Sequence, residues 1–205
     1  MMAMELDDKT LIVKLRAGDE SALEGLMTQY QTKVFGLSLR LTGNRQDAEE
    51  VLQDVFLTVM RKIHTFRGEA KLSSWIYRVT TNTALMKLRK RPKVAPIPLA
   101  EELGPEMSEE GVVGKPLPDW SKLPSDELQK KELLARIEEA LMKLPAEYRS
   151  VFVLRDVEGF SASEACEVLE ISLAALKSRL HRARLFMRKE LAGFVASQVP
   201  TLRGN

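Results

Sequence analysis

The chain has 205 residues, of which 44% are hydrophobic and 29% are charged, so it is long enough for one or two packed domains. Its single cysteine, Cys166, excludes an internal disulfide, and the sequence shows neither an apolar run of membrane-spanning length nor a signal-peptide pattern. The formal net charge of +2 comes from 31 Lys and Arg against 29 Asp and Glu. We therefore expect a cytoplasmic protein without membrane insertion.

The N-terminal part of the sequence predicts a series of amphipathic helices. A short helix is expected over 10–17, a second over 19–30 and a third over 34–41. Gly43 suits the left-handed backbone that commonly closes a helix, so it is expected to end the third. The residues expected to point inward in the second of these helices are Leu23, Leu26, Met27 and Tyr30.

The best-defined helix of this half is expected over 45–62, with Asn44 as its N-cap. Acidic residues fall on one face of it, at Asp47, Glu50 and Asp54. Acids early in a helix stabilise its N-terminus, so this face is either a capped and solvated surface or an acidic strip that docks a basic partner. A different face predicts a core stripe made of Val51, Leu52, Val55, Phe56, Val59 and Met60.

Aromatic and basic residues interleave over 64–91, where a glycine-containing loop precedes another helix. This pattern suits an unstacked single strand of nucleic acid, because rings stack on bases and cations pair with phosphates. The alternative is that the apolar residues only build the core, which we expect for Ile76, Val79 and Leu85, whereas Trp75 can do both. The remaining residues of the pattern are Tyr77, Arg78, Asn82, Lys87, Arg89, Lys90 and Arg91.

Residues 92–125 hold most of the nine prolines, with six acidic and three basic side chains, and are expected to form a flexible linker. A helix restarts at Ser125 or Asp126. Pro145 suits the first turn of the next helix, and 193–205 are expected to be a frayed tail. Because no period-2 alternation of any length appears, the expected fold class is all-α.

The stretch 159–191 predicts a helix-turn-helix. Ser161 and Glu164 have the spacing of a capping box, and Ser172 can cap the second helix. The second helix holds six Lys and Arg against one acid, Glu190. A helix buried on one side and cationic on the other suits a DNA groove, although a solvated amphipathic helix is the alternative. Its buried face is expected to contain Leu173, Leu176, Leu180, Ala183 and Met187.

Four stretches, in order, resemble the bacterial extracytoplasmic-function (ECF) sigma factors, the small class with two conserved sigma domains. They are D-A-E-E-V-L-Q-D-V-F-L (47–57), F-R-G-E-A-K-L-S-S-W-I-Y-R-V-T-T-N-T-A (66–84), L-P-A-E-Y-R-S-V-F-V-L-R (144–155) and S-A-S-E-A-C-E-V-L-E-I-S-L-A-A-L-K-S-R-L-H-R-A-R (161–184). The resemblance implies a promoter-specificity subunit of RNA polymerase. It implies a sigma region 2-like domain over 1–91 and a sigma region 4-like helix-turn-helix domain over 126–192, joined by the linker.

The resemblance also implies the contacts of each domain. Docking on the clamp helices of the largest polymerase subunit is implied for Asp47, Glu50, Gln53 and Asp54. Contact with the −10 element, including capture of a flipped base, is implied for Phe66, Arg67, Gly68, Lys71, Trp75, Arg78 and Asn82. Contact with the −35 element is implied for Arg149, Lys177, Ser178, Arg179, His181 and Arg182, of which Arg149 and Arg179 resemble phosphate contacts. Further implied partners are the flap of the second-largest subunit and an anti-sigma factor.

The sequence departs from the family pattern at two positions. Glu170 stands where the family commonly has a glycine, so the turn must form without that residue's backbone freedom. Met86 stands where the family often has an aspartate. His181 suits a surface histidine as well as a base contact.

No enzyme and no cofactor are expected, because the sequence has no P-loop and its two histidines, His64 and His181, are far apart. Strand opening would then be driven by capture of flipped bases. A free-standing helix-turn-helix regulator is the alternative function, and a decoy that binds polymerase or an anti-sigma factor is a third class.

A coil of the linker's length spans on the order of 30 Å, whereas the two promoter elements of the family lie about two turns of DNA apart, roughly 70 Å. We therefore expect the isolated protein to bind promoter duplex poorly.

Overall fold

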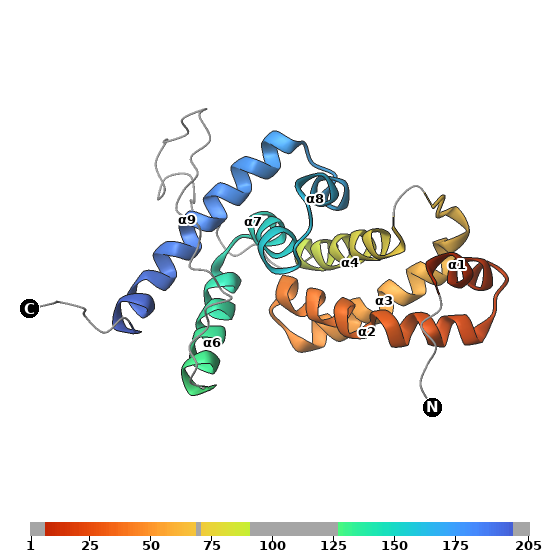
Figure 1. Cartoon of the computed structure of the whole chain (residues 1–205), viewed down its shortest axis with the longest axis horizontal. Helices are drawn as coiled ribbons and strands as arrows, with labels where there is room; N and C mark the ends of the chain where they lie inside the picture. The colour runs from red at the N-terminus through yellow and green to blue at the C-terminus, as the bar shows by residue number, and fades with distance from the viewer. Residues whose placement is uncertain (1–6, 69–70, 91–126, 199–205) are drawn as a thin grey trace, which may run out of the picture.

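The structure is a computed structural model that describes residues 7–68, 71–90 and 127–198. All regular elements in these ranges are helical, which confirms the all-α class (Figure 1). The linker expected over 92–125 and residues 199–205 lie outside the described residues. The elements are α1 (Asp8–Arg16), α2 (Glu20–Thr42), α3 (Arg45–Lys62), η1 (Ile63–Thr65), α4 (Leu72–Arg89), α6 (Glu127–Lys143), α7 (Ala146–Phe152), η2 (Val153–Val157), α8 (Ala162–Leu169) and α9 (Leu173–Gln198).

In the N-terminal lobe, α1 to α4, local capping fixes where α1, α2 and α3 begin. Asp7, Asp19 and Asn44 each accept a hydrogen bond from a backbone N–H in the following turn, at 2.6, 2.9 and 3.0 Å. Such bonds satisfy donors that have no partner inside the helix. The helix expected over 45–62 is confirmed as α3, with Asn44 as its N-cap.

α2 is one continuous helix, so the predicted division into helices over 19–30 and 34–41 is wrong. The intervening residues 31–33 contain neither glycine nor proline, and nothing in them stops a helix. The helix ends at Gly43, whose φ of +68° confirms the expected left-handed closure. A single buried stripe crosses the predicted break and contains Leu26, Tyr30, Val34, Leu37 and Leu41.

α2, α3 and α4 pack on one another around an apolar core, and α1 lies against α2. Met27 and Met60 were expected in this core, but they are 40% and 49% exposed. Each directly follows a fully buried residue, Leu26 or Val59. Because successive residues are turned by about 100° around a helix, the position after a buried one can face solvent although it is apolar.

The C-terminal lobe, α6 to α9, contains the expected helix-turn-helix. Pro145 precedes α7, and α8 and α9 follow a π-helical turn, η2. The turn between α8 and α9 is closed by Glu170, whose φ of +55° is left-handed. The chain thus uses a non-glycine residue in the conformation that the family's glycine would adopt without strain. α9 runs to Gln198, past residue 193 where a frayed tail was expected.

The two lobes lie against each other (Figure 1). α4 of the N-terminal lobe packs on α8 and α7, and α2 contacts α6, α7 and η2. The sulfur of Met142 in α6 lies only 2.2 Å from where a Cβ at Gly43 would sit. Glycine at the end of α2 therefore serves both the left-handed backbone and the close approach of the lobes.

Replacing Glu170 by glycine should raise the free energy of unfolding by about 0.5 kcal/mol. Glycine relieves the strain of the left-handed backbone, and this gain exceeds both its entropy cost in the unfolded chain and the loss of the exposed ion pair between Glu170 and Arg78. Urea unfolding followed by circular dichroism measures the change. Glu167→Gly is the matched control: it lies exposed inside the regular part of α8, where glycine should cost about 1 kcal/mol. Equal destabilisation by both variants would show that the turn is unstrained.

Candidate nucleic-acid and polymerase interfaces

The helix-turn-helix is held by caps at the start of both of its helices. The Ser161 hydroxyl accepts from the Glu164 N–H at 3.2 Å, and the Glu164 carboxylate accepts from the Ser161 N–H at 2.9 Å, which confirms the capping box. These bonds from Ser161 lower the pKa of Glu164. The Ser172 hydroxyl accepts from the Ala175 N–H at 3.2 Å, so it caps α9 as predicted.

α9 presents its predicted base-facing residues near its start. Lys177 is exposed, while Ser178, His181 and Arg182 are half-buried along the same segment. Leu176, Leu180, Ala183 and Met187 are buried as expected. Leu173 was expected among them, but it is 48% exposed, because it lies in the first turn of α9, before the helix enters the lobe's core.

Arg179 and Arg184 of α9 are among the basic residues that the protein itself engages. Arg179 forms an ion pair with Glu147 at 3.2 Å. Arg184 donates two hydrogen bonds to Asp156, at 2.8 and 2.7 Å, and this raises the pKa of Arg184. Asp156 lies in η2, and no sequence pattern indicated this partner. Part of the positive charge of α9 is thus matched within the lobe.

Arg149 was expected to contact phosphate, but it is 7% exposed in this structure. Its guanidinium donates to the carbonyl oxygen and to the sulfur of Met142, at 3.5 and 3.1 Å. A side chain folded back on α6 in this way does not present its charge to solvent. Arg149 in this conformation therefore supports the packing of α7 on α6.

The loop before α4 is held by contacts that the sequence did not reveal. Phe66 is 6% exposed and its ring lies 5.3 Å from that of Trp75, so both aromatics belong to the packing of this corner. Arg16 of α1 donates to the carbonyl oxygens of Ile63 and Phe66 and ties the loop to the bundle. Trp75 remains partly accessible.

The other predicted −10 residues lie on the outer side of the N-terminal lobe. Gly68 has a φ of +78°, which favours glycine at the tip of the loop. Lys71 and Asn82 are exposed, and Arg78 is half-buried beside α8. Arg67 is exposed in the loop. The structure therefore brings the loop and α4 residues onto one lobe surface, which α8 borders.

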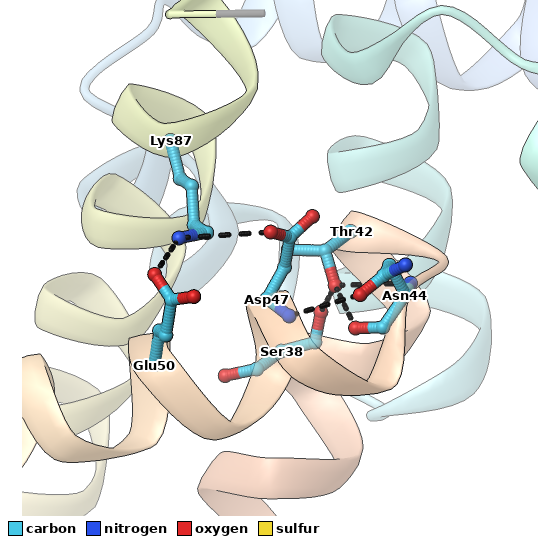
Figure 2. A network of polar contacts seen from close by, with 6 residues as sticks. All are labelled: Ser38, Thr42, Asn44, Asp47, Glu50 and Lys87. Carbon is cyan, nitrogen blue, oxygen red and sulfur yellow. Dashed lines mark hydrogen bonds and ion pairs between the residues drawn. The ribbon is translucent and has the colours of Figure 1, made fainter.

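The acidic strip on α3 is divided between internal and external contacts. Gln53 and Asp54 are exposed, whereas the side chain of Asp47 is only 13% exposed. Figure 2 shows Lys87 of α4 reaching both Glu50 and Asp47, the latter at 3.6 Å. The negative charge of α3 is thus partly balanced by α4, and the outward charge of the strip rests mainly on Asp54 and half-exposed Glu50.

Within the described ranges, no group of three or more His, Cys, Asp or Glu side chains could hold a metal ion. None of the described helices is both long and apolar enough to cross a membrane. Cys166 is a free thiol and is half-buried in α8.

This geometry defines a helix-turn-helix protein with a second helical lobe packed against it. The family described as Sigma-70 region 2 matches residues 26–93, and the family described as Sigma-70, region 4 matches residues 134–187. The chain is 31% identical over 190 residues to the ECF RNA polymerase sigma-E factor of Haemophilus influenzae, covering 93% of this chain and 98% of that protein. It is 32% identical over 195 residues to the ECF RNA polymerase sigma factor SigW of Bacillus subtilis, covering 92% and 98%.

Two solved structures share the fold. The first is of CnrH in complex with the cytosolic domain of CnrY, with a TM-score of 0.60 and 20% identity over 94% of this chain and 99% of that chain. The second is of the sigma factor RpoE in complex with the anti-sigma factor NepR from Bartonella quintana, with a TM-score of 0.58 and 22% identity over 82% and 96%.

The chain belongs to the ECF family of RNA polymerase sigma factors, which recognise promoters and direct transcription initiation. Sigma factors are initiation factors rather than enzymes. A free-standing regulator is not favoured, because the region 2 match accounts for the N-terminal lobe, which such a regulator would not need.

Replacing Lys87 by alanine should lower the free energy of unfolding by about 1 kcal/mol, because it removes the cation beside the mostly buried Asp47. Thermal or urea unfolding of the purified chain measures the loss. Lys90→Ala is the control: this exposed lysine at the end of the same helix should change stability by less than about 0.5 kcal/mol. A Lys87 variant as stable as the control would mean that the pair contributes nothing.

Proposed function

We propose that the two lobes divide promoter recognition between them. Residues 1–91 bind core polymerase and the −10 element, and residues 126–192 bind the −35 element. The observation that carries this division is the placement of charge: an exposed acid on α3 of one lobe, and an exposed cation at the start of α9 of the other. Each surface is complementary to the partner that the family implies.

Core polymerase would bind along α3, where Glu50, Gln53 and Asp54 reach solvent. Complementary charge speeds encounter and fixes the register of two surfaces. The apolar side chain of Leu57, one turn further along α3, is 48% exposed and extends this surface. The clamp helices of the largest subunit are the partner that this strip fits, and the flap of the second-largest subunit would take the C-terminal lobe.

The −10 element would bind as a single strand across the loop and α4. Phe66, Arg67 and Gly68 form the loop, and the partly accessible Trp75 stands at the start of the helix, where an unstacked base can lie. Stacking of a base on an aromatic ring contributes about 1–3 kcal/mol, which is similar to the cost of unstacking it from the duplex. Asn82 and Lys71 offer an amide and a cation to the bases and phosphates that follow.

The −35 element would bind as duplex in its major groove, entered by the start of α9. Lys177 reaches outward, with Ser178, His181 and Arg182 behind it on the same helix. Side chains near the beginning of a recognition helix reach base edges, and cations around them neutralise phosphates. Arg179 would have to exchange Glu147 for a phosphate to make the implied contact.

An anti-sigma factor is a further proposed partner. One of the two solved structures that share the fold is a complex of a sigma factor with an anti-sigma factor, and the other is a complex of CnrH with the cytosolic domain of CnrY. Because core RNA polymerase is the partner that the family requires, we infer that this chain acts in the cytoplasm.

Asp54→Ala should weaken binding to purified core polymerase by about tenfold, because it removes an exposed charge of the acidic strip. A fluorescence titration of labelled protein with core enzyme measures the affinity. Glu49→Ala makes the same charge change on the same helix, where Glu49 pairs with Arg45 at 2.9 Å away from the strip. Equal loss in both variants would show a general charge effect and would reject the strip.

Lys177→Ala should reduce transcription by about tenfold, because it removes an exposed cation from the recognition helix. The assay is run-off transcription by reconstituted holoenzyme on a promoter that the wild-type holoenzyme selected from random DNA. Lys131→Ala, an exposed lysine of α6, is the control and should leave transcription unchanged. Unchanged transcription in the Lys177 variant would reject Lys177 as a contact of the −35 element.

A further inference from the structure

A nearly buried carboxylate joins the two lobes. Glu158 lies just after η2 in the C-terminal lobe, and its side chain is 14% exposed. It accepts from the guanidinium of Arg40 in α2 at 2.7 Å and from the hydroxyl of Tyr77 in α4 at 3.0 Å. Both donors belong to the N-terminal lobe. Burial, and then the negative charge of Glu158, raise the pKa of the Tyr77 hydroxyl far above its ordinary value, so it stays a donor.

A second acid of the C-terminal lobe faces a cation of α4, since Glu170 lies 3.3 Å from Arg78. Arg78 belongs to the surface proposed for the −10 strand. In this structure a carboxylate therefore stands beside a cation that a phosphate would need.

We propose that the free chain closes on itself, with Glu158 and Glu170 forming a latch that holds the helix-turn-helix against α4 as a competitor of the promoter strand. This inference rests on the proposed −10 surface. A cation paired with a carboxylate of α8 does not pair with a phosphate at the same time, so the lobes must part before the strand occupies α4. The interaction surface is the outer side of α4, and its partner in the free protein is the chain's own helix-turn-helix.

The contact between the lobes contains one ion pair that is shielded from water and one that is exposed to it. The ring of Phe160 lies 4.9 Å from the ring of Tyr77, and Glu158 beside them is largely shielded from water. The pair between Arg78 and Glu170 is half-exposed, at 43% and 63%, so salt and solvent screen it strongly. Closure thus depends chiefly on Glu158, while Glu170 marks where the competing strand would enter.

Distances between the lobes test closure directly in the full-length chain. Spin labels are attached to cysteines placed at Arg61 of α3 and Ala174 of α9, both exposed, in a Cys166→Ala background. Pulsed electron paramagnetic resonance should give one narrow distance population for the wild type. The double variant Glu158→Gln with Glu170→Gln should shift to longer, broader distances, with the ratio of closed to open molecules falling about tenfold.

The matched control is Glu138→Gln with Glu167→Gln, which changes the net charge equally on exposed positions of the same lobe. It should keep the wild-type distances. A broad distribution in the wild type, or equal distributions in the latch and control variants, would overturn the proposal. A charge exchange guards against simple misfolding: Arg40→Glu alone should open the chain, and adding Glu158→Lys should close it again. A double variant that stays open after the charge exchange also contradicts the latch.

Competition with nucleic acid is the second measurement. A fluorescein-labelled single-stranded 20-mer is titrated with the free protein at low salt, and anisotropy reports binding. The Glu158→Gln and Glu170→Gln variant should bind about tenfold more tightly than the control variant of equal charge. Equal affinity would overturn the competition. Neither measurement involves polymerase, so failure of the chain to bind core enzyme would reject the proposed function without deciding whether the latch exists.

Discussion

The arrangement of the two lobes depends on which hydrogen-bond donors reach one carboxylate that is shielded from water. A carboxylate that loses water must gain hydrogen-bond donors or give up its charge. Glu158 gains both of its donors from the opposite lobe, and 118 positions of sequence separate it from Arg40. The segment that carries it is shaped locally, by the π-helical turn before it and by a hydrogen bond from Arg155 to the carbonyl of Phe160. The local backbone therefore positions Glu158, and residues distant in the sequence supply the donors for its charge.

α4 connects the core of the N-terminal lobe to both surfaces proposed on that lobe. Its inner side places Leu72, Ile76 and Ala84 in the core. Lys87 near its end balances two acids of α3, so the same helix that would bind a nucleic-acid strand also sets how much negative charge α3 offers to polymerase. Because these roles share one rigid element, a change in how α4 packs would alter both the −10 surface and the acidic strip.

Local signals in the sequence predicted local structure well. The caps Asn44 and Ser161 and the left-handed Gly43 set helix ends where they were expected, because each acts through its own neighbouring backbone. Exposure of Met27, Met60 and Leu173 was missed, since an apolar pattern does not say where neighbouring helices end. Burial of Arg149 and the contacts of Glu158 depend on residues distant in sequence, and no periodicity or spacing encodes them. Spacing and composition indicated the acidic face, the aromatic and basic segment and the cationic helix, whereas the role of each site residue came from the family motifs.

A polar contact between the lobes suits a protein that must change partners. An interface closed by apolar side chains alone would gain nothing from an approaching polyanion, because such burial does not respond to charge. The carboxylate opposite Arg78 responds directly, since a strand of phosphates offers this cation of the proposed −10 surface a denser array of negative charge. Screening acts mainly on the exposed pair at Glu170, whereas the shielded pair at Glu158 is affected less. Opening would therefore begin at the helix-turn-helix turn and reach Glu158 last, so the acid that is hardest to hydrate would set how long the free chain stays closed.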